Sequence, residues 1–347
     1  MFATIAFTIF VFFKELSVLR RKIIHIAISL VIAVALLWLI YYKVSERLGM
    51  FDFRIVVSLL FNSSMKVFIA ILFLFLMPLN WALEAWKWKL ASSTVERIGF
   101  SKAYIAVLAG ITAGFFLPNR VGEFAGKALI FPLRLFWKGT VVAMFTSLAQ
   151  LFVTIGLGFV ALWHFAPIAS AYFQIGAQRL FLVLALVGFS ALLLVYFNIQ
   201  SIAIIFRKLP RLHRVMSTLT AISFSLKTKI LVVSIFRYFV FTIQNILLLI
   251  MVEVELPVID MFFLISLMFF ILAAIPTIFI TELPTRGSVM VFLFLMYFDV
   301  GGIVVPFAVE MKLLLAASIV WLVNIIVPSV PGIFFLTRMS VFRKEDS

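Results

Sequence analysis

The stretch Phe115-Phe-Leu-Pro-Asn-Arg-Val-Gly-Glu-Phe-Ala-Gly-Lys127 brings several charged residues into a strongly apolar part of the chain. The charges follow fifteen apolar or small residues, 103–117, which as a helix span about 22 Å. A hydrocarbon core is about 30 Å thick, so this run is too short to cross it. Pro118 lacks an N–H and suits the first turn of a new helix. The pattern predicts a re-entrant helical hairpin over residues 103–135, with its turn near mid-depth in the membrane.

The two faces of this predicted hairpin differ in chemistry. On a helix that starts at Pro118, the charged residues fall within roughly a 60° arc; they are Arg120, Glu123, Lys127 and Arg134. The small residues that form a second face are Gly122 and Gly126, and the preceding arm has the same spacing in Gly110 and Gly114. Small residues four apart let two helices approach closely in lipid. The alternative is a short spanning helix followed by an amphipathic helix at the interface.

The overall composition is that of a multi-pass membrane protein. Of the 347 residues, 65% are hydrophobic and 12% are charged, whereas about 25% of the residues in soluble domains are charged. The length allows roughly six to nine membrane elements and leaves no run for a separate soluble catalytic domain. The chain therefore belongs to the all-α polytopic class, and any chemistry takes place in or at the bilayer.

Metal, cofactor and nucleic-acid binding find little support in the sequence. There is no cysteine, and His25, His164 and His213 are too scattered to indicate a metal cluster. We expect no metal and no cofactor. The net charge of +15 is attributed to cytoplasmic loops and anionic lipid rather than to nucleic acid.

Hydrophobic runs and basic loops together predict the topology. An apolar and basic segment, residues 1–22, precedes a transmembrane domain over residues 23–336, and a basic tail covers residues 337–347. The six predicted full spans are residues 23–42, 67–81, 139–163, 180–197, 230–252 and 306–327. The positive-inside rule places both termini and the basic loop 207–229 in the cytoplasm, and residues 253–260 outside.

A second short element repeats the pattern of the first. Residues 261–275 are apolar and stop at Pro276, and a second short arm runs from Pro284 to Phe298. We therefore predict a second re-entrant hairpin over residues 261–298, inserted from the opposite face. Two opposed hairpins that meet near the midplane are typical of inverted-repeat transporters.

Each predicted hairpin contains a Pro-x-Arg tripeptide with a carboxylate nearby. These are Pro118-Asn-Arg120 with Glu123, and Pro284-Thr-Arg286 with Glu282. The N-terminus of a half-helix carries a partial positive charge, and arginine binds phosphate with two hydrogen bonds. We predict that Arg120, Glu123, Lys127, Glu282 and Arg286 bind a substrate. The structural alternative is that the charges pair only to lock the hairpin tips, although charges inside a membrane more often mark a pathway.

Further charged and polar residues lie in the full spans. Arg237 and Glu310 are predicted to line one cavity and to bind substrate as well. The alternative for each is an interhelical hydrogen bond or a side chain that reaches the interface. That alternative is favoured for Lys312 and Asn324. Gln150 is a weaker candidate for the site than these residues. Residues 84–90 mix aromatic and cationic side chains, which is typical of an anchor at the membrane interface.

At these residues the chain resembles the lysylphosphatidylglycerol synthase transmembrane-region family. Leu117-Pro-Asn-Arg-Val-Gly-Glu123 is similar to that family's Pro-x-Arg-x-Gly-Glu signature, and Lys127 matches a basic residue that commonly follows four positions later. Glu282-Leu-Pro-Thr-Arg-Gly287 is similar to the second motif, which usually reads Gly-x-Arg, with Pro284 in place of the glycine. The resemblance covers about residues 20–336. It implies a flippase-like domain of a bacterial cytoplasmic membrane, without the aminoacyl-transferring domain of the fused members.

The function predicted from the sequence is to bind a phospholipid or lipid-linked amphiphile, with an anionic head group expected, and to translocate it between leaflets. No ATP-binding motif occurs, so movement is expected to be passive or coupled to an ion gradient. One alternative is a membrane-embedded transferase that acts on a lipid, which requires an activated nucleophile or a carboxylate near a metal. Another is a non-catalytic partner of a separate lipid-modifying enzyme.

Overall fold

The computed structural model describes residues 61–114, 120–168, 178–199, 201, 208–276, 279–302 and 307–342. The predicted segment 1–22, the predicted span 23–42 and Pro118 lie outside these residues. The described helices are α3 (Ser64–Ser92), α4 (Phe100–Ala113), α5 (Gly122–Ala128), α6 (Leu133–His164), α8 (Gln178–Phe197), α10 (Pro210–Met216), η3 (Ser217–Ala221), α11 (Phe224–Met251), α12 (Val258–Ala274), α13 (Phe279–Val300), α14 (Phe307–Trp321), η4 (Leu322–Ile326) and α15 (Val327–Phe342).

The predicted fold class is confirmed. The described residues form helices and no strand. Within this part of the chain, five helical segments are long and apolar enough to cross a membrane; they are Ser64–Ser92, Leu133–His164, Phe224–Met251, Thr281–Val300 and Ala308–Leu336. The chain is an all-α polytopic membrane protein.

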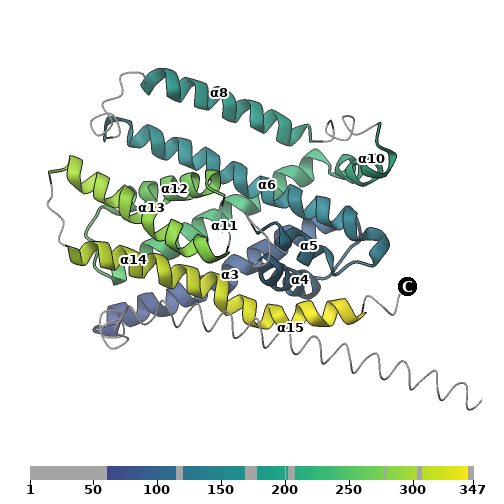
Figure 1. The fold of residues 1–347 in the computed structure, drawn as a ribbon, viewed down its shortest axis with the longest axis horizontal. Coiled ribbons are helices and arrows are strands. Elements are labelled where there is room, and N and C mark those ends of the chain that lie inside the picture. Colours follow the sequence, from purple (N-terminus) through teal and green to yellow (C-terminus); the bar gives the residue numbers. More distant parts are fainter. Residues whose placement is uncertain are drawn as a thin grey trace, which may run out of the picture.

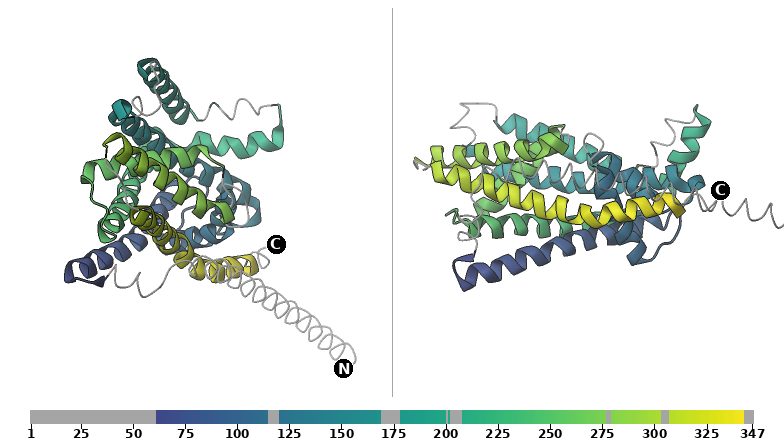
Figure 2. Two further views of the ribbon diagram at one scale, coloured as in Figure 1. Left: turned by 60° about the vertical axis from the view of Figure 1, so that its left-hand side comes forward. Right: turned by 60° about the horizontal axis from the view of Figure 1, so that its bottom comes forward.

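Three long helices, α3, α6 and α11, form the centre of the bundle (Figure 1). α3 packs along α11, and α6 contacts both. α12, α13 and α14 pack around one half of these helices, whereas α4 and α5 pack against the other half. α8 packs against α6 at the edge of the bundle (Figure 2).

The apolar core is divided into two clusters along the long helices. One cluster joins the first turns of α3 and the last turns of α6 and α11 to α12, α13 and α14. The other joins the last turns of α3 and the first half of α6 to α4. On α11 the stretch between Leu231 and Phe241 separates the two clusters, and it contains Arg237.

The first predicted hairpin corresponds to two short helices that fold against each other. α4 has 14 residues and α5 has seven, so neither is long enough to cross a membrane. A Cβ added to Gly122 would lie 2.0 Å from the Ala113 carbonyl oxygen, and one added to Gly126 would lie 2.7 Å from Gly110 Cα. Gly114 is less crowded, since its Cβ would lie 3.4 Å from that of Arg120. The two backbones thus meet at these glycines.

Arg134 does not lie on the charged face of α5, and the prediction that it does is wrong. α5 ends at Ala128, and a new helix, α6, begins after Pro132. Pro132 breaks the helical phase, because it adopts extended backbone angles before the first turn of α6. Arg134 is exposed on that first turn.

The second predicted hairpin is longer than expected. α12 ends at Ala274, just before Pro276, as the pattern predicts. α13 begins at Phe279, however, so Pro284 lies inside this helix and does not start it. A proline removes a single backbone hydrogen bond there, which membrane helices tolerate. The second arm is therefore long enough to cross a membrane by itself.

Two helix ends also differ from the prediction, and both helices are longer. The predicted last span, 306–327, continues past Pro328 into α15, which reaches Phe342, so residues 337–342 of the predicted tail are helical. The π-helical segment η4 precedes Pro328, and proline fits the first turn of the helix that follows. α3 extends from the predicted end at Trp81 to Ser92. This extension places Glu84 and Lys87 inside the bundle instead of at an interface.

Candidate functional site

A cavity of about 380 Å³ lies among the three long helices. Its walls come from α3, α5, α6, α11, α12 and α13, and its charged lining residues are Glu84, Lys87, Arg120, Glu123, Arg237 and Arg286. The lining positions on α6 and α11 lie near the middle of these helices, and those on α3 run from Asn80 to Lys87. In helices that cross a membrane, middle positions are near half depth. The tips of both hairpins reach this cavity, since it is lined by Arg120 and by Ala273.

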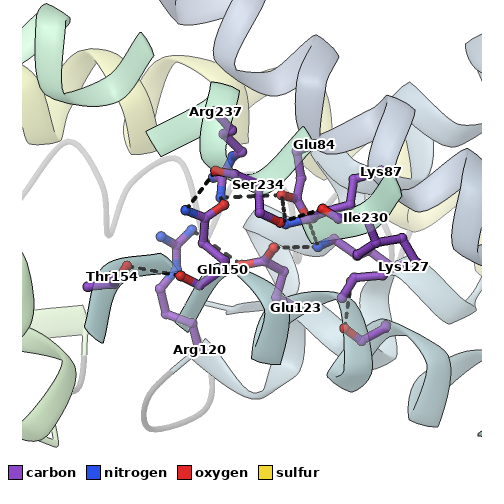
Figure 3. Close-up of polar contacts among 12 residues, drawn as sticks. Glu84, Lys87, Arg120, Glu123, Lys127, Gln150, Thr154, Ile230, Ser234 and Arg237 are labelled. Carbon is purple, nitrogen blue, oxygen red and sulfur yellow. Dashed lines mark hydrogen bonds and ion pairs between the residues drawn. The ribbon is translucent and has the colours of Figure 1, made fainter. Parts of the chain in front are cut away.

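Glu84 is the centre of a buried ion-pair network (Figure 3). Its Oε1 lies 2.7 Å from Lys127 Nζ, and its Oε2 lies 2.7 Å from Lys87 Nζ. Arg237 Nη1 is 3.3 Å from the same Oε2. The side chains of Glu84, Lys87 and Lys127 are exposed by 2%, 1% and 0%. A charge so deeply buried is costly unless it is paired with an opposite charge. Glu84 and Lys87 lie on α3, Lys127 on α5 and Arg237 on α11. The ion pairs of Glu84 therefore hold these three helices together.

Glu123 extends this network to the tip of the first hairpin. Its Oε1 lies 2.7 Å from Lys127 Nζ, and its Oε2 lies 4.0 Å from Arg120 Nη2. Lys127 therefore bridges Glu84 and Glu123, which links α5 to α3. The side chains of Arg120 and Glu123 are 27% and 16% exposed, so this end of the network is accessible from the cavity.

The arginines of the cavity keep unused hydrogen-bond donors. Arg237 Nη1 donates to Gln150 Oε1 at 3.2 Å, and Gln150 in turn donates to the Ser234 carbonyl. Arg286 Nη2 lies 3.8 Å from Glu282 Oε1. Nevertheless, buried N–H groups of all three arginines have no hydrogen-bond acceptor in the described part of the chain; they are Arg120 Nε and Nη2, Arg237 Nε, and Arg286 Nε and Nη1.

Two of these arginines come from opposite halves of the chain. Arg120 and Arg286 line the same cavity, where like charges repel each other. Arg120 also has a φ of 56°, in the left-handed region that a residue with a Cβ rarely adopts. Such strain costs about 1–3 kcal/mol and is commonly found at functional positions.

The charge balance of the site favours an anion. In the described part of the site, four cations share two carboxylates. The cations are Lys87, Lys127, Arg120 and Arg237, and the carboxylates are those of Glu84 and Glu123. Arg286 and Glu282 balance each other. The cavity therefore carries an excess of about two positive charges together with guanidinium N–H groups that need acceptors, which suits the oxygens of a phosphate. No group of three or more His, Cys, Asp or Glu side chains that could hold a metal ion occurs among the described residues.

The structure brings most of the predicted site residues together. Arg120, Glu123, Arg237 and Arg286 line the cavity, and Lys127 and Glu282 bind residues that do. The described residues that line it do not include Glu310, and the prediction that Glu310 shares a cavity with Arg237 stays a prediction. Glu310 lies in the first turn of α14, near the end of the bundle where Lys312 binds Glu253. The role of each lining residue in substrate binding stays a prediction.

The helix-terminus part of the prediction does not match the geometry. Arg286 lies within α13, after its first turn, and α5 has only seven residues. The positive character of the cavity therefore comes from side chains and not from helix N-termini.

Sequence reasoning missed three central residues. Glu84 and Lys87 were interpreted as part of an interface anchor, and Gln150 was ranked low, yet all three line the cavity. The spacing of Asn80, Glu84 and Lys87, four and then three residues apart, places them on one helical face. That polar stripe in an apolar helix was the available signal.

Comparisons with protein-family models, with curated proteins and with solved structures found no match to this chain.

Proposed function

We propose that this protein binds a phospholipid, or another amphiphile with a lipid-linked phosphate, in the central cavity and moves it between the two leaflets. The observation that carries the proposal is the convergence of Arg120, Arg237 and Arg286, from three separate elements, on one cavity at mid-length of α6 and α11. Their buried N–H groups lack acceptors in the described chain. A buried donor without an acceptor costs about 1–3 kcal/mol, more for a charged group, and a phosphate bound there removes this cost.

An apolar wall of the same cavity supports an amphiphile over a soluble anion. Leu151 of α6 lines the cavity and is also 37% exposed on the surface of the bundle. Ala273, at the tip of the second hairpin, is both a lining residue and an exposed one. The cavity wall thus includes exposed apolar side chains beside its charged groups. A head group can then lie among the arginines while its acyl chains stay in the bilayer.

The resemblance to the lysylphosphatidylglycerol synthase transmembrane-region family supports the same proposal. The arginines of both motif-like stretches, Arg120 and Arg286, line one cavity although they are distant in sequence. Shared placement of this kind is expected if both motifs serve one ligand. On this basis we propose a flippase-like protein of the bacterial cytoplasmic membrane.

Fluorescent-lipid scrambling in proteoliposomes tests the proposal. The wild-type chain is expected to move fluorescent phosphatidylglycerol between leaflets faster than protein-free vesicles do. Arg120→Gln removes charge-assisted hydrogen bonds and is expected to slow movement by about tenfold or more. Arg97→Gln is the matched control, because Arg97 is exposed in a loop outside the cavity. The absence of wild-type scrambling, or equal rates for Arg120→Gln and the control, would overturn the proposal.

A further inference from the structure

The two carboxylates that line the cavity among the described residues are already paired with cations. Glu84 already binds Lys87, Lys127 and Arg237, and Glu123 already binds Lys127 and lies 4.0 Å from Arg120. An ammonium group on a ligand would have to displace one of these cations. Displacement would leave a buried lysine or arginine without its partner, which is strongly unfavourable.

Aromatic faces are the other common binding surface for an ammonium group, and two of the rings that line the cavity already hold a cation. The guanidinium carbon of Arg237 lies 5.2 Å from the centre of the Trp81 ring. That of Arg286 lies 6.0 Å from the centre of the Phe241 ring. Cation–π attraction at these two rings is therefore already satisfied by the protein itself.

Lys87 has a particular place in this arrangement. It is the lysine that lines the cavity among the described residues, and its side chain is 1% exposed and bound to Glu84. Lys127 and Arg237 still neutralise Glu84 when Lys87 is replaced. The positive charge of Lys87 is therefore not needed to neutralise Glu84, and it adds to the excess positive charge that a ligand meets.

We infer that the cavity selects anionic head groups against those that carry an ammonium group, and that the excess positive charge contributed by Lys87 sets this selectivity. The inference rests on the proposed function, which it deepens by naming the charge class of the ligand. Lys87 is a specificity-determining residue in this account. A phosphatidylglycerol-like head group fits the cavity, whereas phosphatidylcholine and phosphatidylethanolamine place a positive charge in a positive field.

The test measures dissociation constants for two pairs of probes with the purified full chain in detergent. The lipid pair is dioctanoyl phosphatidylglycerol and dioctanoyl phosphatidylcholine, and the soluble pair is glycerol 3-phosphate and phosphocholine. In each pair both probes carry a phosphate, and one adds a quaternary ammonium. We expect the anionic lipid to bind at least about tenfold more tightly, because unit charges several ångströms apart interact strongly in a partly buried site.

Two variants examine the role of Lys87. Lys87→Gln is expected to lower the phosphatidylglycerol to phosphatidylcholine selectivity by about tenfold, since one unit of excess positive charge is lost. The matched control is Lys89→Gln, because Lys89 lies two residues further on α3 and its Nζ lies over the Trp86 ring. Lys89→Gln should leave the selectivity unchanged. Lys87→Met is a second variant that keeps the methylene packing.

The outcomes separate the inference from the proposed function. Equal binding of the two lipids by the wild-type chain would overturn the inference, whether or not the variants fold. Unchanged selectivity in a folded Lys87 variant would overturn the role of this residue. If neither lipid binds but glycerol 3-phosphate binds more tightly than phosphocholine, the charge selectivity stands and the lipid function fails. If no probe of either pair binds, both are wrong.

Discussion

Lys127 Nζ on α5 lies 2.7 Å from Glu84 Oε1 on α3, and both side chains are almost completely buried. This pair fastens the short hairpin to α3, which packs along α11. It also sets the position of Glu123, which shares the same lysine, and of Arg120 at the hairpin tip.

Glu84→Gln is expected to destabilise the protein strongly. Three buried or half-buried cations, Lys87, Lys127 and Arg237, lose the carboxylate that they share. Removal of one partner from a buried ion pair costs about 3–5 kcal/mol. The measurement is equilibrium unfolding in detergent, with Glu96→Gln in an exposed loop as the control, for which we expect a change within about 0.5 kcal/mol. Equal stability of the two variants would contradict the assignment of Glu84 as the centre of the network.

Gly122→Ala should separate the two arms of the first hairpin. The added Cβ would lie 2.0 Å from the Ala113 carbonyl oxygen, so the backbone has to move. Overpacking of this kind costs about 1–3 kcal/mol or more. Gly188→Ala is the control, because Gly188 is exposed on α8 and no described atom lies within 4 Å of its added Cβ. Alanine there should be neutral or slightly stabilising, through its higher helix propensity. A Gly122→Ala protein as stable as the control would show that the arms do not touch.

The sequence predicts structural features well when they depend on residues that are close together in the chain. The glycines at Gly110, Gly122 and Gly126 predict a close helix contact, because small residues four apart matter only where two backbones meet. Pro276 predicts the end of α12, because proline lacks the N–H that a helix would need there. These features need no knowledge of the rest of the chain.

Features that depend on long-range packing were predicted less well. Pro284 and Pro328 suggest helix boundaries, yet α13 begins before Pro284 and helix continues beyond Pro328. The residues from Glu84 to Leu90 have the composition of an interface anchor, and only packing against α5 and α11 reveals Glu84 as a buried carboxylate.

The stability contributed by Glu253 is expected to depend on pH. A hydrogen bond from Lys66 and the positive charge of the same lysine lower the pKa of Glu253 below its usual value of 4.5. Because the folded pKa is lowered, this contribution is present above the ordinary pKa and is lost as the pH falls through the folded pKa. Thermal midpoints of wild type and Glu253→Gln should therefore differ at pH 7 and converge as the pH falls below the lowered pKa of Glu253.

The Lys66→Met background provides the control for this prediction. Lys66 Nζ lies 2.6 Å from Glu253 Oε1, so Lys66 is the main cause of the lowered pKa, and Lys312 at 3.7 Å contributes less. Glu253→Gln also keeps the backbone shape at this position, which has a φ of 58°. In the Lys66→Met background the substitution should have little pH-dependent effect. If Glu253→Gln changes the thermal midpoint as much with Lys66→Met as with Lys66, the pH dependence must come from other groups.

Opposite ends of the bundle should face opposite sides of the membrane. Exposed cations lie where α4, α6, α10 and α11 begin; they are Arg97, Lys102, Arg134, Lys208 and Lys229. Glu253 and Glu255 lie at the other end of α11. The positive-inside rule places the basic end in the cytoplasm. Because the native chain has no cysteine, single cysteines at Lys208 and Glu255 can be labelled with an impermeant maleimide. Labelling of both from the same side would refute this topology.

The central claim is that a lipid phosphate binds among the arginines of the cavity. An experimental structure of the full chain in nanodiscs that contain phosphatidylglycerol tests it most directly. The account predicts phosphate density in the cavity, with oxygens about 2.7–3.0 Å from the guanidinium groups of Arg120 and Arg286. A cavity that holds only water or acyl chain, with every ordered lipid phosphate at the outer surfaces of the bundle, would contradict it.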